Sequence, residues 1–87
     1  MASRARKLPR SVHSPEQQAF RELMIQARAR SGLTQQILAK RLGKPQSFVA
    51  KYEGGERRLD VMEFIGIARV LGADPVRLLR ELVKRLS

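Results

Sequence analysis

The sequence predicts an all-α domain of five short helices, and three observations lead to this prediction. Apolar residues recur at helical spacing in successive segments, and no segment shows the apolar–polar alternation of a half-buried strand. Each segment is bounded by a residue that can cap a helix start or by a glycine that can end a helix. The 87 residues include no cysteine and no tryptophan, so one small core must be packed from mainly aliphatic side chains.

The first two helices are predicted from their start and stop signals. Ser14 and Pro15 form a helix start, because serine can cap free backbone N–H groups and proline suits the first helical position. An apolar stripe follows, and Gly32 ends this helix as a left-handed cap. Thr34 caps the second helix, which runs to about residue 42 before Gly43 closes it.

A third helix is predicted over residues 46–53. Lys44 and Pro45 precede it, and the residue before a proline is pushed out of helical geometry, so the chain must turn there. Gly54 and Gly55 terminate the helix. Two short helices joined by a tight turn are typical of a helix-turn-helix.

The fourth helix is predicted from a capping-box start at Asp60 to a stop near Gly72. Its residues are apolar nearly all round the helix. A helix of this kind is expected to be buried on several sides. We therefore expect it to form the spine of the core.

The fifth helix, predicted over residues 74–86, has a wide apolar face. This face covers an arc of roughly 160°, whereas a helix packed on one core needs a stripe of about 100°. The excess predicts that the helix dimerises, with an interface formed by Val76, Leu79, Leu82, Val83 and Leu86. The alternative, in which the wide stripe only covers a small core, stays open at this point.

Positive charge is concentrated at the N-terminus. The formal net charge is +10, and the first ten residues carry four bases and no acid. Residues 1–13 are predicted to be a flexible basic arm, and residues 14–87 to be the folded domain. The arm residues expected to contact DNA are Arg4, Arg6, Lys7 and Arg10. This charge favours a polyanion partner, with nucleic acid as the first candidate and a merely solubilising surface as the alternative.

Several functional classes are disfavoured by the composition. No apolar run reaches the roughly 18–20 residues of a membrane span, and no secretory signal follows the basic start. The single histidine, His13, has no cysteine or paired carboxylate beside it, so we expect neither an enzyme nor a metal site. We expect no cofactor and no small-molecule ligand, and a cytoplasmic location.

A resemblance to a known family covers residues from about 20 to 79. It rests on Gly32-Leu33-Thr34-Gln35, Leu38-Ala39, Leu42-Gly43, Gln46-Ser47 with Val49, Tyr52-Glu53 with Gly55, and Leu71-Gly72. In these positions the chain resembles the phage-repressor and Cro-like helix-turn-helix family, also called the XRE type. The resemblance implies a lambda-repressor-like domain whose second and third helices form a unit that binds double-stranded DNA.

The family implies particular roles for residues of the third helix. Gln46 and Ser47 match its base-contacting positions, and glutamine can pair with both N6 and N7 of adenine. Helix geometry places Ala50 on the same side, within reach of a thymine methyl group. Lys51 lies nearby, and contact with a base or with the DNA backbone is equally compatible with its position.

Further positions match residues that hold the DNA backbone or orient the third helix. The expected phosphate contacts are Gln35, Lys44, Arg57 and Arg58, and in the family the residue at position 35 also braces the first side chain of the third helix. Arg28 and Glu53 match a pair that forms an internal salt bridge. Three residues depart from the usual pattern, namely Ile37, Pro45 and Phe48.

These observations together predict a dimeric, sequence-specific transcriptional regulator, most simply a repressor on a pseudo-palindromic operator. The resemblance does not separate this function from a DNA-binding antitoxin or from a controller protein of a restriction–modification system. A protein of another class also fits part of the pattern, because a basic amphipathic last helix is typical of membrane-surface binding. RNA binding is less compatible, since the chain lacks aromatic residues for stacking single-stranded bases.

Overall fold

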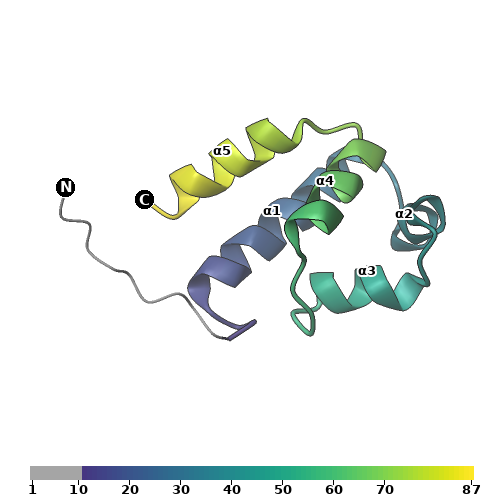
Figure 1. Cartoon of the computed structure of the whole chain (residues 1–87), viewed down its shortest axis with the longest axis horizontal. Helices are drawn as coiled ribbons and strands as arrows, with labels where there is room; N and C mark the ends of the chain where they lie inside the picture. Colours follow the sequence, from purple (N-terminus) through teal and green to yellow (C-terminus); the bar gives the residue numbers. More distant parts are fainter. Residues whose placement is uncertain (1–10) are drawn as a thin grey trace.

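The computed structural model describes residues 11–87, and within this range the chain forms five helices and no strand (Figure 1). The helices are α1 (Pro15–Ser31), α2 (Gln35–Leu42), α3 (Gln46–Glu53), α4 (Val61–Val70) and α5 (Pro75–Arg85). The predicted all-α, five-helix fold is therefore confirmed. The predicted DNA contacts in the arm lie outside the described residues, namely Arg4, Arg6, Lys7 and Arg10.

Local capping chemistry sets most of the helix boundaries. The Ser14 hydroxyl accepts a hydrogen bond from Gln17 N at 3.1 Å, and the Thr34 hydroxyl accepts one from Ile37 N at 3.1 Å. Asp60 and the residue three positions later form a complete capping box at α4. By contrast, Pro45 precedes α3 and supplies no side-chain cap. The start of α3 must therefore be fixed by its packing.

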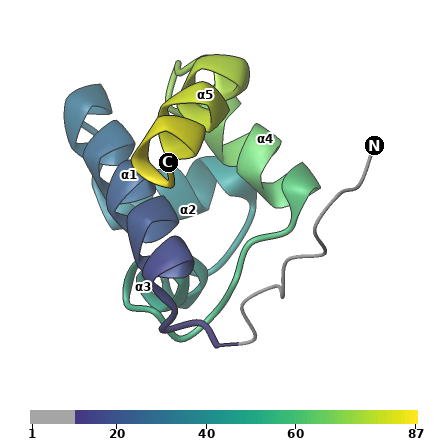
Figure 2. The same ribbon diagram turned by 90° about the vertical axis from the view of Figure 1, so that its left-hand side faces the viewer.

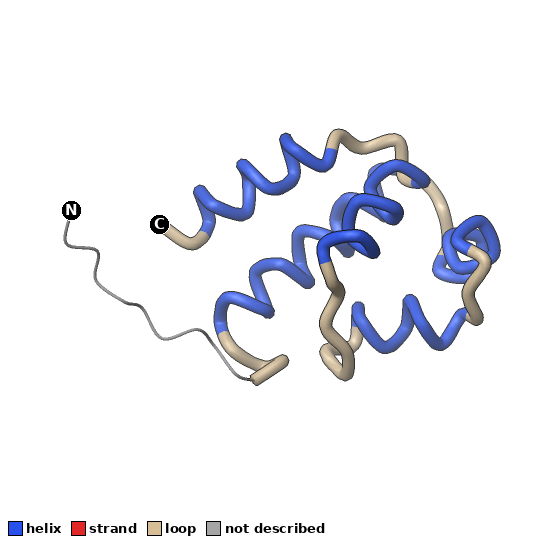
Figure 3. The backbone as a smooth tube through the Cα atoms, in the orientation of Figure 1, coloured by secondary structure: helices blue, strands red, loops and turns tan. Residues whose placement is uncertain are grey.

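The core lies between α1, α2, α3 and α4, with α5 closing one side. Figures 1 and 2 place α3 and α5 on opposite sides of the molecule, with α1 and α4 between them. Short links join α1 to α2 and α2 to α3, whereas the loop between α3 and α4 is longer (Figure 3). The most deeply buried side chains come from four different helices: Leu23, Met24, Leu38, Val49 and Ile67. This packing leaves one long side of α3 at the surface.

The expectation that α4 is buried on several sides is wrong for its first turn. Phe64, Ile67 and Ala68 are buried, but Val61 and Met62 are 69% and 73% exposed. The helix packs against α2 and α5. No other part of residues 11–87 covers the outward positions of this first turn. The apolar composition of α4 therefore predicts more burial than the helix has.

The apolar face of α5 divides into two parts. Leu78 is buried and Leu82 packs against the core, so Leu82 lies with the core and not on the exposed surface predicted for a dimer. The other four residues predicted to form the dimer interface remain exposed: Val76 at 60%, Leu79 at 52%, Val83 at 58% and Leu86 at 45%. We call these four residues the α5 stripe. They occupy one side of the helix, at spacings of three, four and three residues.

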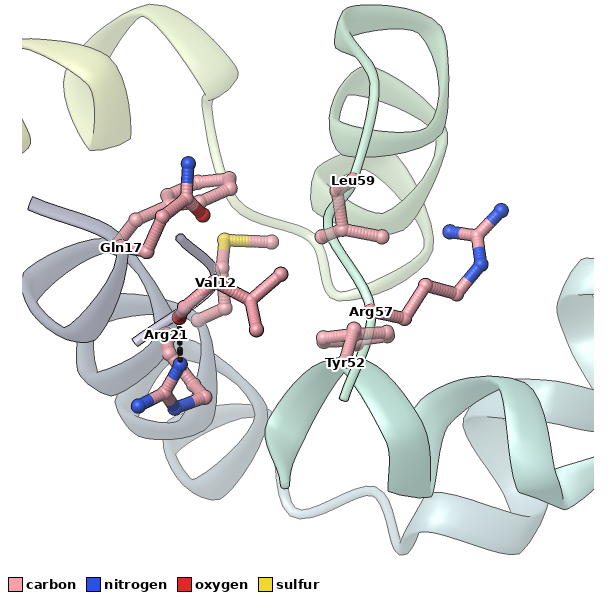
Figure 4. Close-up of a pocket in the computed structure, with 8 residues that line it drawn as sticks. Val12, Gln17, Arg21, Tyr52, Arg57 and Leu59 are labelled. Carbon is pink, nitrogen blue, oxygen red and sulfur yellow. Dashed lines mark hydrogen bonds between the residues drawn. The ribbon is translucent and has the colours of Figure 1, made fainter. Parts of the chain in front are cut away.

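The sequence predicts that residues 11–13 belong to the flexible arm, and this is wrong, because they form a turn against α1. Ser14 N donates to Ser11 O at 3.2 Å, and Arg21 Nη1 donates to Val12 O at 3.1 Å (Figure 4). The side chain of Val12 is half-buried in a small pocket beside Tyr52 (Figure 4). Among the helices of residues 11–87, none has both the length and the apolar character needed to cross a membrane.

Candidate nucleic-acid interface

One side of α3 presents polar and small side chains to solvent. Gln46, Ser47, Ala50 and Lys51 are all exposed, and their spacing of one, four and five residues places them on a common face. Val49 and Tyr52 on the opposite face are buried, at 0% and 3% exposure. The four side chains predicted to contact bases are therefore brought together on one accessible surface.

The C-terminal end of α3 is tied to α1 by a double hydrogen-bonded ion pair. Arg28 Nε donates to Glu53 Oε2 at 2.7 Å, and Arg28 Nη2 donates to Glu53 Oε1 at 3.0 Å. Only 6% of the Glu53 side chain and 20% of the Arg28 side chain are exposed. The hydrogen bond to Glu53 raises the pKa of Arg28. Because a paired guanidinium and carboxylate have a fixed relative geometry, this pair orients α3 on α1.

Gln35 joins the same carboxylate from a third helix. Its amide Nε2 donates to Glu53 Oε1 at 2.9 Å. Bracing of the first side chain of α3 was expected from the family resemblance, but in the structure the Gln35 amide is bound at the opposite end of α3. Glu53 thus receives hydrogen bonds from α1 and α2, and it links both helices to α3.

The remaining residues predicted to contact phosphate lie around the start of α3 and in the loop that follows it. Lys44 and Arg58 are exposed. The guanidinium of Arg57 is engaged by the carboxylate of Glu63, with Nη1–Oε1 at 2.9 Å and Nη2–Oε2 at 2.8 Å. This hydrogen bonding raises the pKa of Arg57 and lowers the pKa of Glu63.

The ring of Phe48 lies close to two of these cations. The Arg57 guanidinium carbon lies 4.7 Å from the centroid of the Phe48 ring, and Lys44 Nζ lies 5.6 Å from it. The same ring packs edge-to-face on Tyr52, with centroids 5.6 Å apart. In the sequence, Phe48 stands out only as a departure from the family pattern. Nothing in the local spacing indicated that residues from a turn and a distant loop would meet on its ring.

A second contact that the sequence does not predict lies at the C-terminal end of α3. Arg21 bonds the carbonyl of Val12 and lies against the turn at Gly55, where an added Cβ would come within 3.1 Å of the guanidinium. Gly55 has a φ of +81°, a backbone conformation that favours glycine at this position. The nearby Tyr52 hydroxyl is buried without a hydrogen-bond partner, and burial raises the pKa of Tyr52. Arg21 and Tyr52 line a small cavity together with Val12 (Figure 4). Its volume is about 10 Å³.

Comparisons with known proteins agree with this arrangement. A family model described as a helix-turn-helix domain matches residues 19–82. Among solved structures, an XRE-family like protein from Pseudomonas syringae pv. tomato str. DC3000 is 47% identical in sequence. The two structures superpose with a TM-score of 0.80, over 87% of this chain and 93% of that chain.

The chain belongs to the XRE family of helix-turn-helix proteins. No curated protein matches the chain. As a member of the XRE family, the protein has a DNA-binding helix-turn-helix formed by α2 and α3, and its partner is double-stranded DNA. The family and the fold are those of a DNA-binding regulator. No group of three or more histidines and acids that could hold a metal ion occurs in residues 11–87.

Proposed function

We propose that this XRE-family protein is a dimeric repressor that recognises a pseudo-palindromic operator by placing α3 in the major groove. The observation that carries the proposal is the exposed face of α3, on which Gln46, Ser47, Ala50 and Lys51 lie together. Glutamine, serine and lysine can exchange hydrogen bonds with base edges, and the alanine methyl can contact thymine.

Contacts to the DNA backbone would fix the register of α3 on the duplex. Lys44 and Arg58 flank the helix in sequence and are exposed, so they are the proposed phosphate-binding side chains. At the start of α2, Thr34 caps only the N–H of Ile37. The N–H groups of Gln35 and the residue after it are left for a phosphate, which a helix N-terminus also favours electrostatically.

The α5 stripe is the proposed dimer contact. It consists of four large apolar side chains that are about half exposed. They belong to α5, the helix that lies on the opposite side of the molecule from α3 (Figures 1 and 2). A two-fold axis beside α5 would pair this surface with itself, as an isologous dimer requires. The two copies of α3 would then read two half-sites of opposite orientation, about one turn of DNA apart.

Selection of bound sites from a random DNA library tests these points together. The expected result is a symmetric site with two half-sites centred about 10 base pairs apart. Enrichment of a single half-site would contradict the dimer, and the absence of any enrichment would contradict sequence-specific recognition. A promoter carrying the selected site upstream of a reporter gene should then lose expression when the protein is present, whereas activation would contradict the assignment as a repressor.

A further inference from the structure

Arg57 links three separate elements beside the DNA-reading helix. It lies in the loop between α3 and α4, it pairs with Glu63 on α4, and its guanidinium covers the ring of Phe48 on α3. The same guanidinium donates from Nη1 to the carbonyl of Arg58 at 2.8 Å. One side chain therefore connects the loop to the helices on either side of it.

The hydrogen-bonding capacity of Arg57 is largely used within the protein. A guanidinium has five N–H donors, and three hydrogen bonds from Nη1 and Nη2 already go to protein oxygens. The two-pronged edge formed by Nη1 and Nη2 is the edge that grips Glu63. Glu63 in turn accepts a hydrogen bond from Asp60 N at 2.9 Å as part of the capping box of α4. The carboxylate that holds Arg57 is thus itself fixed at the start of a helix.

The contact with Phe48 lies at the end of α3 that lacks a side-chain cap. Pro45 gives the start of α3 no side-chain cap, whereas the far end of the helix is held by the Arg28–Glu53 pair. Phe48 is the next residue after Ser47 and the second after Gln46. A rotation of the first turn of α3 that moves Phe48 away from Arg57 would also displace Gln46 and Ser47, two of the four proposed base-reading side chains.

We propose that Arg57 is a positioning residue for base readout, with Glu63 and Phe48 as its two anchors, and is not a phosphate ligand. This role differs from the phosphate contact that the family resemblance implies for this position. It rests on the proposed function, because it requires α3 to read a specific sequence. In this role Arg57 fixes the first turn of α3, and its own charge is balanced by Glu63.

The two roles predict different effects on binding to specific and random DNA. Arg57→Met removes the ion pair and keeps an apolar stem over Phe48. If Arg57 positions α3, this variant should bind the selected operator about tenfold more weakly, the loss expected when one two-pronged base contact is misaligned, and random DNA nearly as before. The matched control is Arg58→Met, which should weaken binding to both DNAs alike. The control should also lower the slope of log K against log salt by about 0.9.

Glu63→Gln separates the two roles by the sign of the effect. This change breaks the ion pair and raises the net charge by one. If Arg57 binds phosphate, releasing it from Glu63 should increase affinity for both operator and random DNA. If Arg57 positions α3, affinity for the operator should fall relative to random DNA, as it does in Arg57→Met. Increased affinity for both DNAs, or an Arg57→Met variant that behaves as Arg58→Met does, would overturn the proposal.

Phe48 supplies a third variant that changes no charge. Phe48→Leu should reduce the ratio of operator to random binding and leave the salt slope unchanged, and Phe48→Tyr, which keeps the ring, should restore the ratio. Thermal unfolding of each variant checks that the domain is folded at the assay temperature. Equal ratios for Phe48→Leu and the unmodified protein would contradict the proposal. If the unmodified protein itself shows no preference for any sequence, the proposed function has failed, and this outcome is distinguishable from all the others.

Discussion

The ion pair between Arg28 and Glu53 should contribute more to stability than a surface salt bridge does. Arg28→Met would leave the carboxylate of Glu53, which is 6% exposed, with Gln35 as its remaining side-chain partner. Removing one partner of a deeply buried pair costs about 3–5 kcal/mol, whereas an exposed pair contributes about 0.2–1 kcal/mol. Because Arg28 retains 20% exposure, we expect a loss at the lower end of the buried range, about 3 kcal/mol.

Urea denaturation followed by circular dichroism measures this loss. For a domain of this size, 1 kcal/mol shifts the melting temperature by about 4–8 °C, so Arg28→Met should melt at least about 12 °C lower. The double variant Arg28→Met with Glu53→Gln should recover part of the loss, because the stranded charge is then removed. A loss below about 1 kcal/mol in the single variant would refute the reasoning, since the pair would then behave as an exposed one.

Four other predictions concern recognition, the arm, assembly and pH. Gln46→Ala should weaken operator binding by about 1–3 kcal/mol and leave binding to random DNA unchanged in a mobility-shift titration; equal losses on both DNAs would exclude a base contact. Deleting residues 1–10 should lower DNA affinity with little change in melting temperature, whereas deleting residues 1–13 should also lower the melting temperature, because it removes the turn held by α1. Leu79→Lys should give a folded monomer in sedimentation velocity, since this side chain is exposed, and a persistent dimer would place the interface elsewhere. The pKa of Glu63 is lowered in the folded protein, so its interactions stabilise the fold above the ordinary glutamate pKa of about 4.3 and are lost as pH falls through the lowered value. The difference in unfolding free energy between the unmodified protein and Glu63→Gln should therefore shrink as the pH falls from above about 4.3 through the lowered pKa of Glu63, and a constant difference would contradict the role of the carboxylate.

The helix boundaries could be predicted from the sequence because they depend on short-range chemistry. Ser14, Thr34 and Asp60 each cap a backbone N–H group within three residues, and Gly32 and Gly43 adopt the left-handed conformation that ends a helix. These interactions involve neighbours in the chain and need no knowledge of the fold. The exposed face of α3 follows from the same local information, once the position of the helix is known.

Contacts that depend on tertiary packing could not be predicted in this way. Periodicity grouped Leu82 with the exposed residues of α5, because it cannot tell which part of a wide apolar arc meets the core. The engagement of Gln35 with Glu53, and of Arg57 with Phe48, requires the relative placement of separate helices and of the loop after α3. Side chains of this length can reach several partners, and only the packed structure selects one.

The two faces of α3 have a consequence for how readily this protein can acquire a new DNA target. Val49 and Tyr52 hold the helix from within, whereas the side chains proposed to read bases lie on the outer face, and the two sets share no residue. Surface substitutions away from such anchors usually change stability by no more than about 0.5 kcal/mol. Exchanging residues on the outer face should therefore retarget the protein while the scaffold stays folded, so that sequence preference can diversify independently of stability. Phe48 contributes both to packing, through its contact with Tyr52, and to the proposed position of the reading face, through Arg57. A library designed to alter specificity should therefore keep Phe48 unchanged.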